Sequence, residues 1–331
     1  MLWEKIKNYL KLIRIHSAVL SGVAPVCVAA STGLNVTIYH YIELFVIGLL
    51  VHTYFFVLNE IRDVEFDKKS KYLSEKPLLD GSIIIKQAYF LVISSVVLVL
   101  IFTLIFFYDR FYILLFVSLA SFLFGGLYDI YGKKLPHADY LTAFTVFFMA
   151  LYGGFSVTIN LGLLTYIIAL LAFFQMLINN IIAGLKDVDH DYIAGGLSTP
   201  LRMKVKVEGE LFLVSKHFIA YIVSLKIVHI SLTILPFAMN LIVYENWQFY
   251  IVLILIFIAV AFMIRFLTIK KFEREKIKRA IGFHEMFAFM VVPFIIMGFI
   301  GPIATIFLVI FPVIWLGVFL IIMYGRLMPA I

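Results

Sequence analysis

Long apolar runs, of roughly 17 to 25 residues each, dominate the sequence, and a helix of that length crosses ~30 Å of hydrocarbon. Ten such stretches are present, in the ranges 16–33, 41–58, 84–107, 111–127, 141–158, 161–180, 218–242, 249–267, 283–300 and 303–324. Apolar residues make up 63% of the 331 and charged residues 14%, whereas an average soluble domain carries roughly 25% charge. Secreted, fibrous and disordered classes are therefore excluded. The sequence predicts an all-α, polytopic membrane protein with nine or ten transmembrane helices.

The two ends of this series are the hardest to assign. Prolines at 293, 302 and 312 could turn part of the last two stretches into a broken or re-entrant helix. At the other end, Trp3, Ile6, Leu10 and Ile13 recur at helical spacing among basic residues, which predicts a helix lying in the membrane interface. A cleaved signal peptide is the alternative for this segment. No linker or repeat divides the chain, so residues 1–331 are expected to form one domain.

The distribution of basic residues predicts the orientation. If the ten stretches alternate in direction, Arg110 is the only Lys or Arg in the connections on one side. Cytoplasmic loops of membrane proteins collect Lys and Arg, so both termini and the long loops, residues 59–82 and 184–216, are expected in the cytoplasm. The same rule accounts for the net charge of +7, and nucleic acid is not expected as a partner. No feature of the sequence indicates an obligate protein partner.

Several kinds of site are excluded. Cys27 is the single cysteine, so the chain has neither an internal disulfide nor a cysteine-based metal cluster. The sequence contains no phosphate-binding P-loop and no dinucleotide fingerprint. The neighbours His284 and Glu285 are ionisable residues in an apolar stretch, which makes them functional candidates. A pair at the start of a helix in the interface is the interpretation we favour for them.

Acidic side chains crowd together at two places. In the first, residues 59–67, Asn59, Asp63 and Asp67 are spaced i, i+4 and i+8, so a continuing helix would align them in one stripe. Two carboxylates about 5 to 6 Å apart repel by roughly 2 to 3 kcal/mol at an effective dielectric near 20. A positive partner is therefore expected, and Mg²⁺ with ligands from carboxylates, water and a phosphate is the simplest. The alternative is a solvated helix end whose acids are neutralised by nearby basic residues.

The second acidic segment, residues 187–191, follows the sixth stretch and repeats this spacing with Asp187 and Asp191. Asn180 precedes it by two turns of helix, and Lys186 stands directly before it. Both acidic segments fall on the same predicted side of the membrane, where they could share one cavity. A diphosphate bridged by metal ions and held by Lys or Arg would balance these charges together.

The chain resembles the UbiA superfamily of membrane prenyltransferases. The resemblance rests on the N-x-x-x-D-x-x-x-D pattern of Asn59, Asp63 and Asp67, on Lys76-Pro77-Leu78, on residues 128–133 as a tyrosine and lysine loop, and on the D-x-x-x-D pattern of Asp187 and Asp191. It covers most of the chain. It implies helices around a central cavity where Mg²⁺ holds the diphosphate of a polyprenyl donor.

The resemblance also implies roles for individual residues. Asp63, Asp67, Asp187 and Asp191 would be the catalytic metal ligands, and Asn59, Lys76, Tyr128, Lys133, Asn180 and Lys186 would bind the substrate. Lys76 takes a place more often filled by Arg. Asn180 substitutes for a polar ligand usually found one turn before the second motif, where Ala183 and Gly184 stand.

The expected reaction is Mg²⁺-dependent transfer of a polyprenyl group from its diphosphate to a hydrophobic acceptor in the membrane. The acceptor would be an ether-lipid precursor such as geranylgeranylglyceryl phosphate or a quinone precursor, and Arg202, Lys204 and Lys206 could bind an acceptor phosphate. A transporter is the alternative from another class, because ten spans with polar ends also suit a substrate pathway. A CDP-alcohol phosphotransferase fits less well, since the longer D-G-x-x-A-R run of that family is missing.

Overall fold

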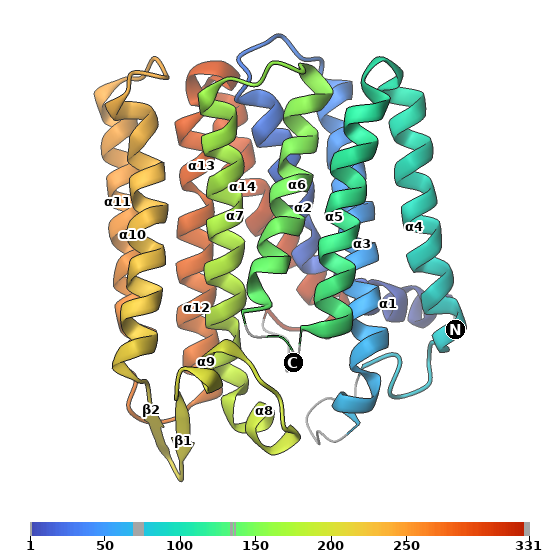
Figure 1. The fold of residues 1–331 in the computed structure, drawn as a ribbon, viewed down its shortest axis with the longest axis vertical. Helices are drawn as coiled ribbons and strands as arrows, with labels where there is room; N and C mark the ends of the chain where they lie inside the picture. Colours follow the sequence, from blue (N-terminus) through green and yellow to red (C-terminus); the bar gives the residue numbers. More distant parts are fainter. Residues whose placement is uncertain (1, 69–75, 133–134, 136, 328–331) are drawn as a thin grey trace.

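The computed structural model describes residues 2–68, 76–132, 135 and 137–327, and within them helices form a bundle with one small hairpin at one end (Figure 1). The long helices are α2 (Ile15–Ala30), α3 (Ile38–Asp67), α4 (Ile85–Phe106), α5 (Phe111–Tyr131), α6 (Asp139–Val157), α7 (Leu163–Ala183), α10 (Lys216–Ala238), α11 (Asn246–Leu267), α12 (Arg274–Phe289) and α14 (Met297–Tyr324). Shorter helices are α1 (Leu2–Leu12), η1 (Tyr108–Arg110), η2 (Gly184–Asp187), α8 (Val188–Ala194), α9 (Thr199–Arg202) and α13 (Val291–Ile295). The expectation of an all-α membrane fold is confirmed.

Helix α2 lies at the centre of the bundle, where it packs against α3, α6 and α14. The contact with α6 depends on Gly153, because a Cβ atom there would lie 1.9 Å from the carbonyl oxygen of Pro25. Small residues allow membrane helices to approach this closely. Gly153 of α6 therefore serves helix packing. It holds α2 and α6 close together, and both helices line an apolar cavity described below.

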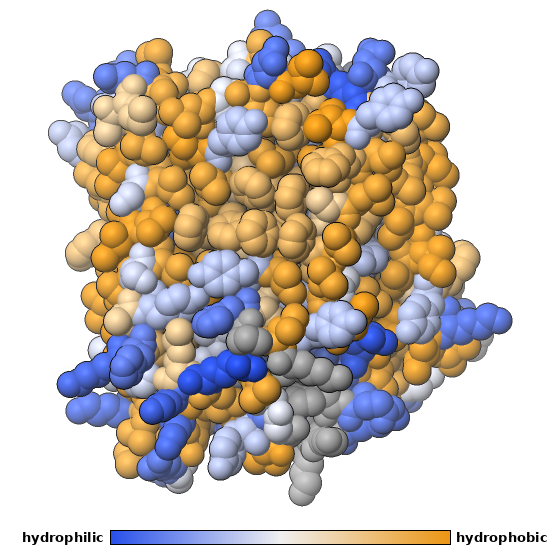
Figure 2. Space-filling view, in the orientation of Figure 1, coloured by the Kyte–Doolittle hydropathy of each residue, from blue (hydrophilic) through white to orange (hydrophobic). Residues whose placement is uncertain are grey.

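In the described part of the chain, eight helices are long and apolar enough to cross a membrane. A ninth span results if α1 and α2, which meet at a bend of 53°, are counted as one. Figure 2 shows a broad band of apolar side chains across the middle of the visible face, with polar residues gathered at its two ends. Such a band is what contact with lipid requires, because apolar side chains on this scale are not stable against water.

The predicted count of ten spans differs from this count at α12. The predicted ninth stretch, 283–300, is built from the end of α12, α13 and the first turn of α14, and α12 itself carries Arg274, Lys276 and Lys278. With 16 residues, α12 is too short to count among the membrane-spanning helices, and its first half is charged. In Figure 1, α12 and α13 nonetheless form one column that runs beside α7.

Helix α1 ends at a sharp change of direction. Arg14, between α1 and α2, has a left-handed backbone with φ of 48°, a conformation that side-chain-bearing residues rarely adopt. Leu2, Trp3 and Ile6 on α1 are exposed, as the interface-helix prediction requires. The bend brings the Arg14 side chain to the interior of the bundle, where it contacts α3.

Residues 184–216, expected as a loop, contain ordered structure. The segment holds η2, α8, α9 and an antiparallel hairpin of β1 (Lys206–Glu208) and β2 (Leu211–Leu213). Gly209 makes the tight turn of the hairpin with φ of +59°. The amide of Phe212 donates to the carbonyl of Lys270 over 2.7 Å, so the hairpin is fixed to the connection between α11 and α12.

Candidate active site

Both acidic segments contribute to one polar cavity at the end of the bundle that carries α8 and α9. The cavity has a volume of about 510 Å³. Its walls come from the ends of α3, α5 and α7, from the start of α6, and from the segment that follows α7. Seven of the residues predicted from the sequence line it: Asn59, Asp63, Tyr128, Asn180, Lys186, Asp187 and Asp191. The expectation that the two segments share one cavity therefore agrees with the geometry.

The first acidic segment lies on α3, which continues as one helix to Asp67. Asn59 and Asp63 line the cavity. The Asn59 side-chain amide donates to Asp129 Oδ1 on α5 over 3.2 Å. The other oxygen of that carboxyl group, Asp129 Oδ2, is buried without a hydrogen-bond partner among the described residues. A polar atom in that position is available to a ligand in the cavity.

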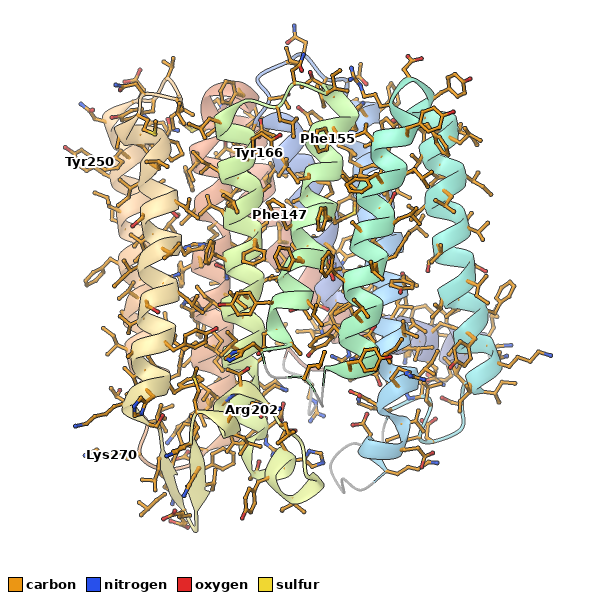
Figure 3. All side chains as sticks on the ribbon, viewed as in Figure 1. Phe147, Phe155, Tyr166, Arg202, Tyr250 and Lys270 are labelled. Atoms are coloured by element: carbon orange, nitrogen blue, oxygen red, sulfur yellow. The ribbon has the colours of Figure 1, made fainter. Side chains whose placement is uncertain are left out.

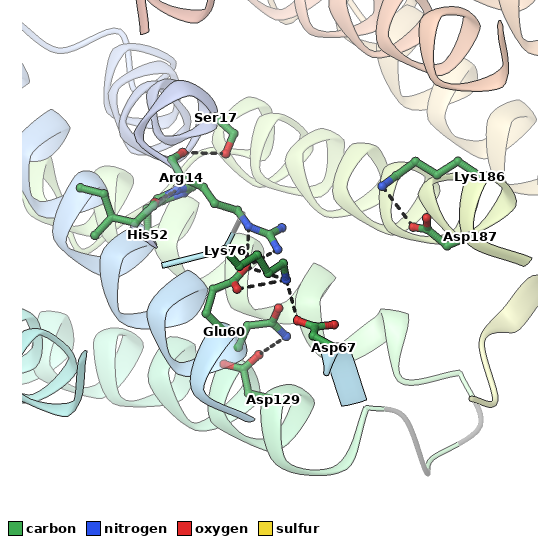
Figure 4. Close-up of polar contacts among 11 residues, drawn as sticks. Arg14, Ser17, His52, Glu60, Asp67, Lys76, Asp129, Lys186 and Asp187 are labelled. Carbon is green, nitrogen blue, oxygen red and sulfur yellow. Dashed lines mark hydrogen bonds and ion pairs between the residues drawn. The ribbon is translucent and has the colours of Figure 1, made fainter. Parts of the chain in front are cut away.

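Asp67 and Lys76 lie outside the cavity lining, because they pair with each other. Lys76 Nζ is 2.7 Å from Asp67 Oδ2 and 3.0 Å from Glu60 Oε2, and Glu60 also accepts from the guanidinium of Arg14 (Figure 4). Side chains of the three residues 60, 67 and 76 are 8% exposed or less. In this structure Lys76 acts as the counter-ion of two buried carboxylates, and the predicted metal role of Asp67 stays a prediction.

The second acidic segment is less buried. Helix α7 ends at Ala183, η2 follows, and α8 begins after Asp187. Lys186 Nζ lies 3.1 Å from Asp187 Oδ2, with their side chains 27% and 39% exposed. In Figure 4 this pair lies apart from the Lys76 cluster. Two of its carboxylates, Asp187 and Asp191, face the same cavity as Asp63.

Asp139, at the start of α6, also lines the cavity, although it was not predicted. Its Oδ1 accepts from the Asn180 amide over 2.7 Å, and its Oδ2 accepts from the Thr199 hydroxyl. Asn180 additionally donates to the Tyr128 hydroxyl over 3.4 Å. These bonds tie α5, α6, α7 and α9 together around the cavity, and they leave Asn180 positioned by Asp139.

Arg14, Asp129 and Asp139 were not predicted, because each stands alone in the sequence, outside the two crowded acidic segments. A lone acid near the end of an apolar span, such as Asp129, was a usable signal. Lys133 lies outside the described residues. Arg202, Lys204 and Lys206 do not line the cavity; Arg202 donates to the carbonyl of Leu197 instead.

A second cavity, of about 470 Å³, adjoins the first. The two have Arg14, Asn180, Ala183 and Lys186 as common lining residues. The walls of the second cavity are mainly apolar and include the following residues: Leu20, Ala24, Val51, Phe55, Val146 and Met149. A smaller chamber of about 120 Å³ continues inward from it and shares Leu20, Val146 and Met176. Polar and apolar spaces therefore follow one another from the end of the bundle toward its interior.

The polar cavity fits a divalent cation only together with an anionic ligand. No three His, Cys, Asp or Glu side chains within the described ranges are grouped closely enough to hold a metal ion by themselves. Asp63, Asp187 and Asp191 nevertheless line one space, and Mg²⁺ commonly takes one or two carboxylates and completes its shell with water and substrate phosphate. The donor set is therefore suited to Mg²⁺ bound with a phosphate compound.

Comparison with known proteins identifies the family. The model of the UbiA prenyltransferase family matches residues 19–291, which include both acidic segments. The chain belongs to this family, and it is a membrane prenyltransferase. No curated protein sequence matches the chain.

Three solved structures have a similar fold. A digeranylgeranylglyceryl phosphate synthase has 20% identity and a TM-score of 0.66, over 90% of this chain and 100% of that one. A UbiA homologue from Aeropyrum pernix K1 has 12% identity and a TM-score of 0.65, over 84% and 95%. A UbiA homologue from Archaeoglobus fulgidus, bound to DMAPP and Mg²⁺, has 19% identity and a TM-score of 0.59, over 86% and 99%.

Proposed function

We propose that this UbiA-family prenyltransferase moves a polyprenyl group from its diphosphate to a hydrophobic acceptor, in a reaction that requires Mg²⁺. The observation that carries the proposal is the polar cavity between the acidic segments, which adjoins an apolar one. A polyprenyl diphosphate has the matching shape, with an anionic head and an apolar chain. The related structure from A. fulgidus, bound to DMAPP and Mg²⁺, supports the same assignment.

The chain's own residues would act mainly through charge. Asp63, Asp187 and Asp191 would hold Mg²⁺, which supplies positive charge to the diphosphate as it leaves. Lys186 lines both cavities, so its ammonium group would lie near the bond that breaks. Donors placed where negative charge develops stabilise the transition state more than the ground state.

The second cavity would exclude water from the reacting carbon. Breaking the allylic carbon–oxygen bond leaves a cation that water would trap. Phe55 and Phe56 line the second cavity, and Phe55 also stacks on Tyr128, with ring centroids 5.8 Å apart. Aromatic faces stabilise a desolvated cation by about 2 kcal/mol or more. Phe55 and Phe56 are therefore suited to the region that the prenyl cation would occupy.

For the acceptor we propose an isoprenoid ether-lipid precursor in preference to an aromatic quinone precursor. The second cavity supports this choice, because Arg14, Lys186 and Lys278 place three cations around a space with apolar walls. An acceptor that carries both a phosphate and an isoprenoid chain would match both features. The related digeranylgeranylglyceryl phosphate synthase fits the same choice.

The experiment compares three acceptors with purified protein, geranylgeranyl diphosphate and Mg²⁺: geranylgeranylglyceryl phosphate, 4-hydroxybenzoate and dihydroxynaphthoate. We expect the first to be prenylated fastest. A clear preference for an aromatic acceptor would refute the ether-lipid assignment and leave prenyl transfer intact. If no acceptor is prenylated and no Mg²⁺-dependent binding of a non-cleavable donor analogue is found by calorimetry, prenyl transfer itself is wrong.

Site variants sharpen this experiment. Asp63→Asn, Asp187→Asn and Asp191→Asn should each lose most of the activity and most of the donor affinity. Asp189→Asn is the matched control from the second acidic segment, because Asp189 pairs with Arg274 at 2.7 Å and does not line the cavity. Equal loss of donor affinity in the control would contradict the assignment of the carboxylates.

We also propose that the end of the bundle with the acidic segments faces the cytoplasm. Arg202 and Lys270 lie toward this end, and the aromatic side chains Tyr166 and Tyr250 lie toward the other (Figure 3). Basic residues gather on the cytoplasmic side and Tyr gathers at the interfaces. Labelling of single cysteines in intact cells, with Cys27 removed, should reach positions 35 and 245 from outside but not position 198.

A further inference from the structure

Glu285 lies in the interior of the bundle, on the face of α12 that lines the cavities. Lys278, Ile281, Gly282 and Glu285 line the second cavity, and Glu285 and Ala288 line the inner chamber. These positions follow helical spacing, so they form one stripe along α12. At 1.5 Å per residue, Glu285 stands about 16 Å along the helix from Arg274. Two charged residues of α12, Lys278 and Glu285, therefore face a cavity instead of lipid.

Glu285 has no protein partner in the described ranges. Neither a hydrogen bond nor an ion pair joins its carboxyl group to another described side chain, and its side chain is partly exposed to the cavity that it lines. Burial of an ionisable group without a partner lowers stability. Residues of this kind inside membrane helices mark substrate or proton pathways. A role toward what the cavity holds is therefore the physical expectation for Glu285.

Glu285 is also the only carboxylate among the described residues that line the two inner spaces. The other ionisable residues around the second cavity are Arg14, His16, His52, Lys186 and Lys278. Cys27 and His229 line the inner chamber. His52 already bonds through both ring nitrogens, to Ser21 Oγ and to the Ile13 carbonyl, each over 3.0 Å. Arg and Lys carry protons, so Glu285, His16 and His229 remain as groups that can accept one, and of these three only Glu285 lines both inner spaces.

Lys186 connects Glu285 with the second acidic segment. It pairs with Asp187, and it lines both the polar cavity and the second cavity, which Glu285 also lines. The boundary between the two cavities is where the carbon next to the diphosphate would lie. An acceptor that approaches this carbon through the second cavity would therefore pass between Lys186 and Glu285.

We propose that Glu285 is the general base that takes the proton from a hydroxyl group of the acceptor. This inference rests on the proposed function. The acceptor's O–H bond breaks and a new bond forms between its oxygen and the first carbon of the prenyl group. The bond from that carbon to the diphosphate breaks, and its electron pair leaves with the diphosphate. The proton passes to the Glu285 carboxylate and from there to water in the polar cavity.

Two groups compete for this role. The departing diphosphate could take the proton itself, and His16 lines the same cavity with an unpartnered Nδ1. The diphosphate would be held on the far side of the boundary, in the cavity that Asp63, Asp187 and Asp191 line. Glu285 lies on the acceptor's side of that boundary. The two alternatives are therefore separable by substitution.

The test is Glu285→Gln, which keeps the size of the side chain and removes its ability to accept the proton. We expect kcat with a hydroxyl acceptor to fall by about 100-fold or more, within the usual range for a general base. KM for the acceptor and the affinity for a non-cleavable donor analogue should stay within about threefold. The wild-type enzyme should lose activity as acid protonates the base, and the variant should lack this acid limb of the kcat/KM profile.

The matched control is Glu275→Gln, the same change at an exposed position of the same helix, which should retain full activity. Glu285→Gln should unfold at the same temperature as wild type or higher, because it removes a charge that no described side chain pairs. Glu285→Asp keeps a carboxylate, so it should keep the acid limb with a reduced kcat.

Three results would overturn the proposal. Unchanged kcat in Glu285→Gln would assign the proton to the diphosphate, and loss of activity only in His16→Gln would assign it to His16. Joint loss of donor affinity and thermal stability in Glu285→Gln would make the role structural. Failure of the proposed function is distinguishable from all three, because the wild-type protein itself would then prenylate no hydroxyl acceptor.

Discussion

The two acidic segments look alike in sequence but are held in different ways. Residues 59–67 lie on an unbroken helix, where Glu60 and Asp67 are buried and already paired with Lys76. Residues 187–191 cross a break between η2 and α8, and Asp187 is 39% exposed beside Lys186. The first segment balances most of its charge within the protein. The second leaves more of its charge to be balanced by a ligand.

This difference assigns different tasks to two lysines. Lys76 stabilises a buried group of carboxylates, whereas Lys186 lines the cavities. A buried ion pair is costly to break because the remaining charge stays buried, and an exposed pair contributes little. The comparison therefore predicts that the first segment determines stability through Glu60 and Asp67 and adds Asp63 to the ligand site. The second segment should act mainly in ligand binding.

The largest expected effect is that of Lys76→Met. Removal of its ammonium group leaves Asp67 without its partner and Glu60 with Arg14 alone. We expect the free energy of unfolding to fall by about 3–5 kcal/mol, measured by denaturant titration in detergent. Lys186→Met is the matched change, and it should cost about 1 kcal/mol or less while it weakens binding of the donor analogue. Equal destabilisation by the two changes would remove the distinction between the segments.

A second prediction concerns the ligand. In the presence of Mg²⁺, diphosphate at a concentration 100 times its dissociation constant from the protein should stabilise the folded state by about 2.7 kcal/mol. Hydrogen exchange should slow most in residues 184–202, whose carboxylates the ligand would neutralise, and least in residues 59–62. Mg²⁺ alone should protect less, because the described residues contain no group of three metal-binding side chains. Equal protection of both segments would show that the first is also incomplete without its ligand.

The features of the fold and the site that follow from local sequence pattern could be predicted. Hydropathy located most of the long helices within a few residues, with α3, α12 and α14 as exceptions, and the spacing of Asn59 and Asp63 placed both on the cavity side of α3. The ion pair between Asp67 and Lys76 could not be predicted, because whether Lys76 meets α3 depends on tertiary structure and not on local pattern. Asp139 joins the site through Asn180 and Thr199, which are distant in sequence.

The helix α12 shows a second limit of local pattern. Its charges lowered the hydropathy of its first half, so the predicted ninth stretch began only at residue 283, whereas the helix begins at Arg274. A hydropathy window assumes that the surroundings of a span are lipid. Lys278 and Glu285 face a cavity instead, and only the packed bundle reveals that surface. The same assumption made His284 and Glu285 look like a pair at a helix start.

The smallest predicted effect is that of Arg274→Met, which tests how the second acidic segment is held in place. Arg274 donates to Asp189 Oδ1 over 2.7 Å and to the carbonyl of Lys186 over 2.9 Å, so it fixes the segment to the start of α12. These groups are partly exposed, and we expect a loss of about 1 kcal/mol of unfolding free energy. Because both acceptors adjoin Asp187, KM for the donor should rise a few fold with kcat unchanged.

Lys276→Met is the matched control for this change, because Lys276 forms an exposed pair with Glu273 one turn away and contacts neither acidic segment. Exposed pairs of this spacing contribute about 0.3–0.5 kcal/mol, so this variant should keep both the wild-type KM and nearly the wild-type stability. A loss of 3 kcal/mol or more in Arg274→Met, measured in the same denaturant titration as Lys76→Met, would mean that the second segment is as firmly built into the protein as the first. Its exposed carboxylates would then be held in position before any ligand binds, and the hydrogen-exchange protection expected for residues 184–202 should be correspondingly small.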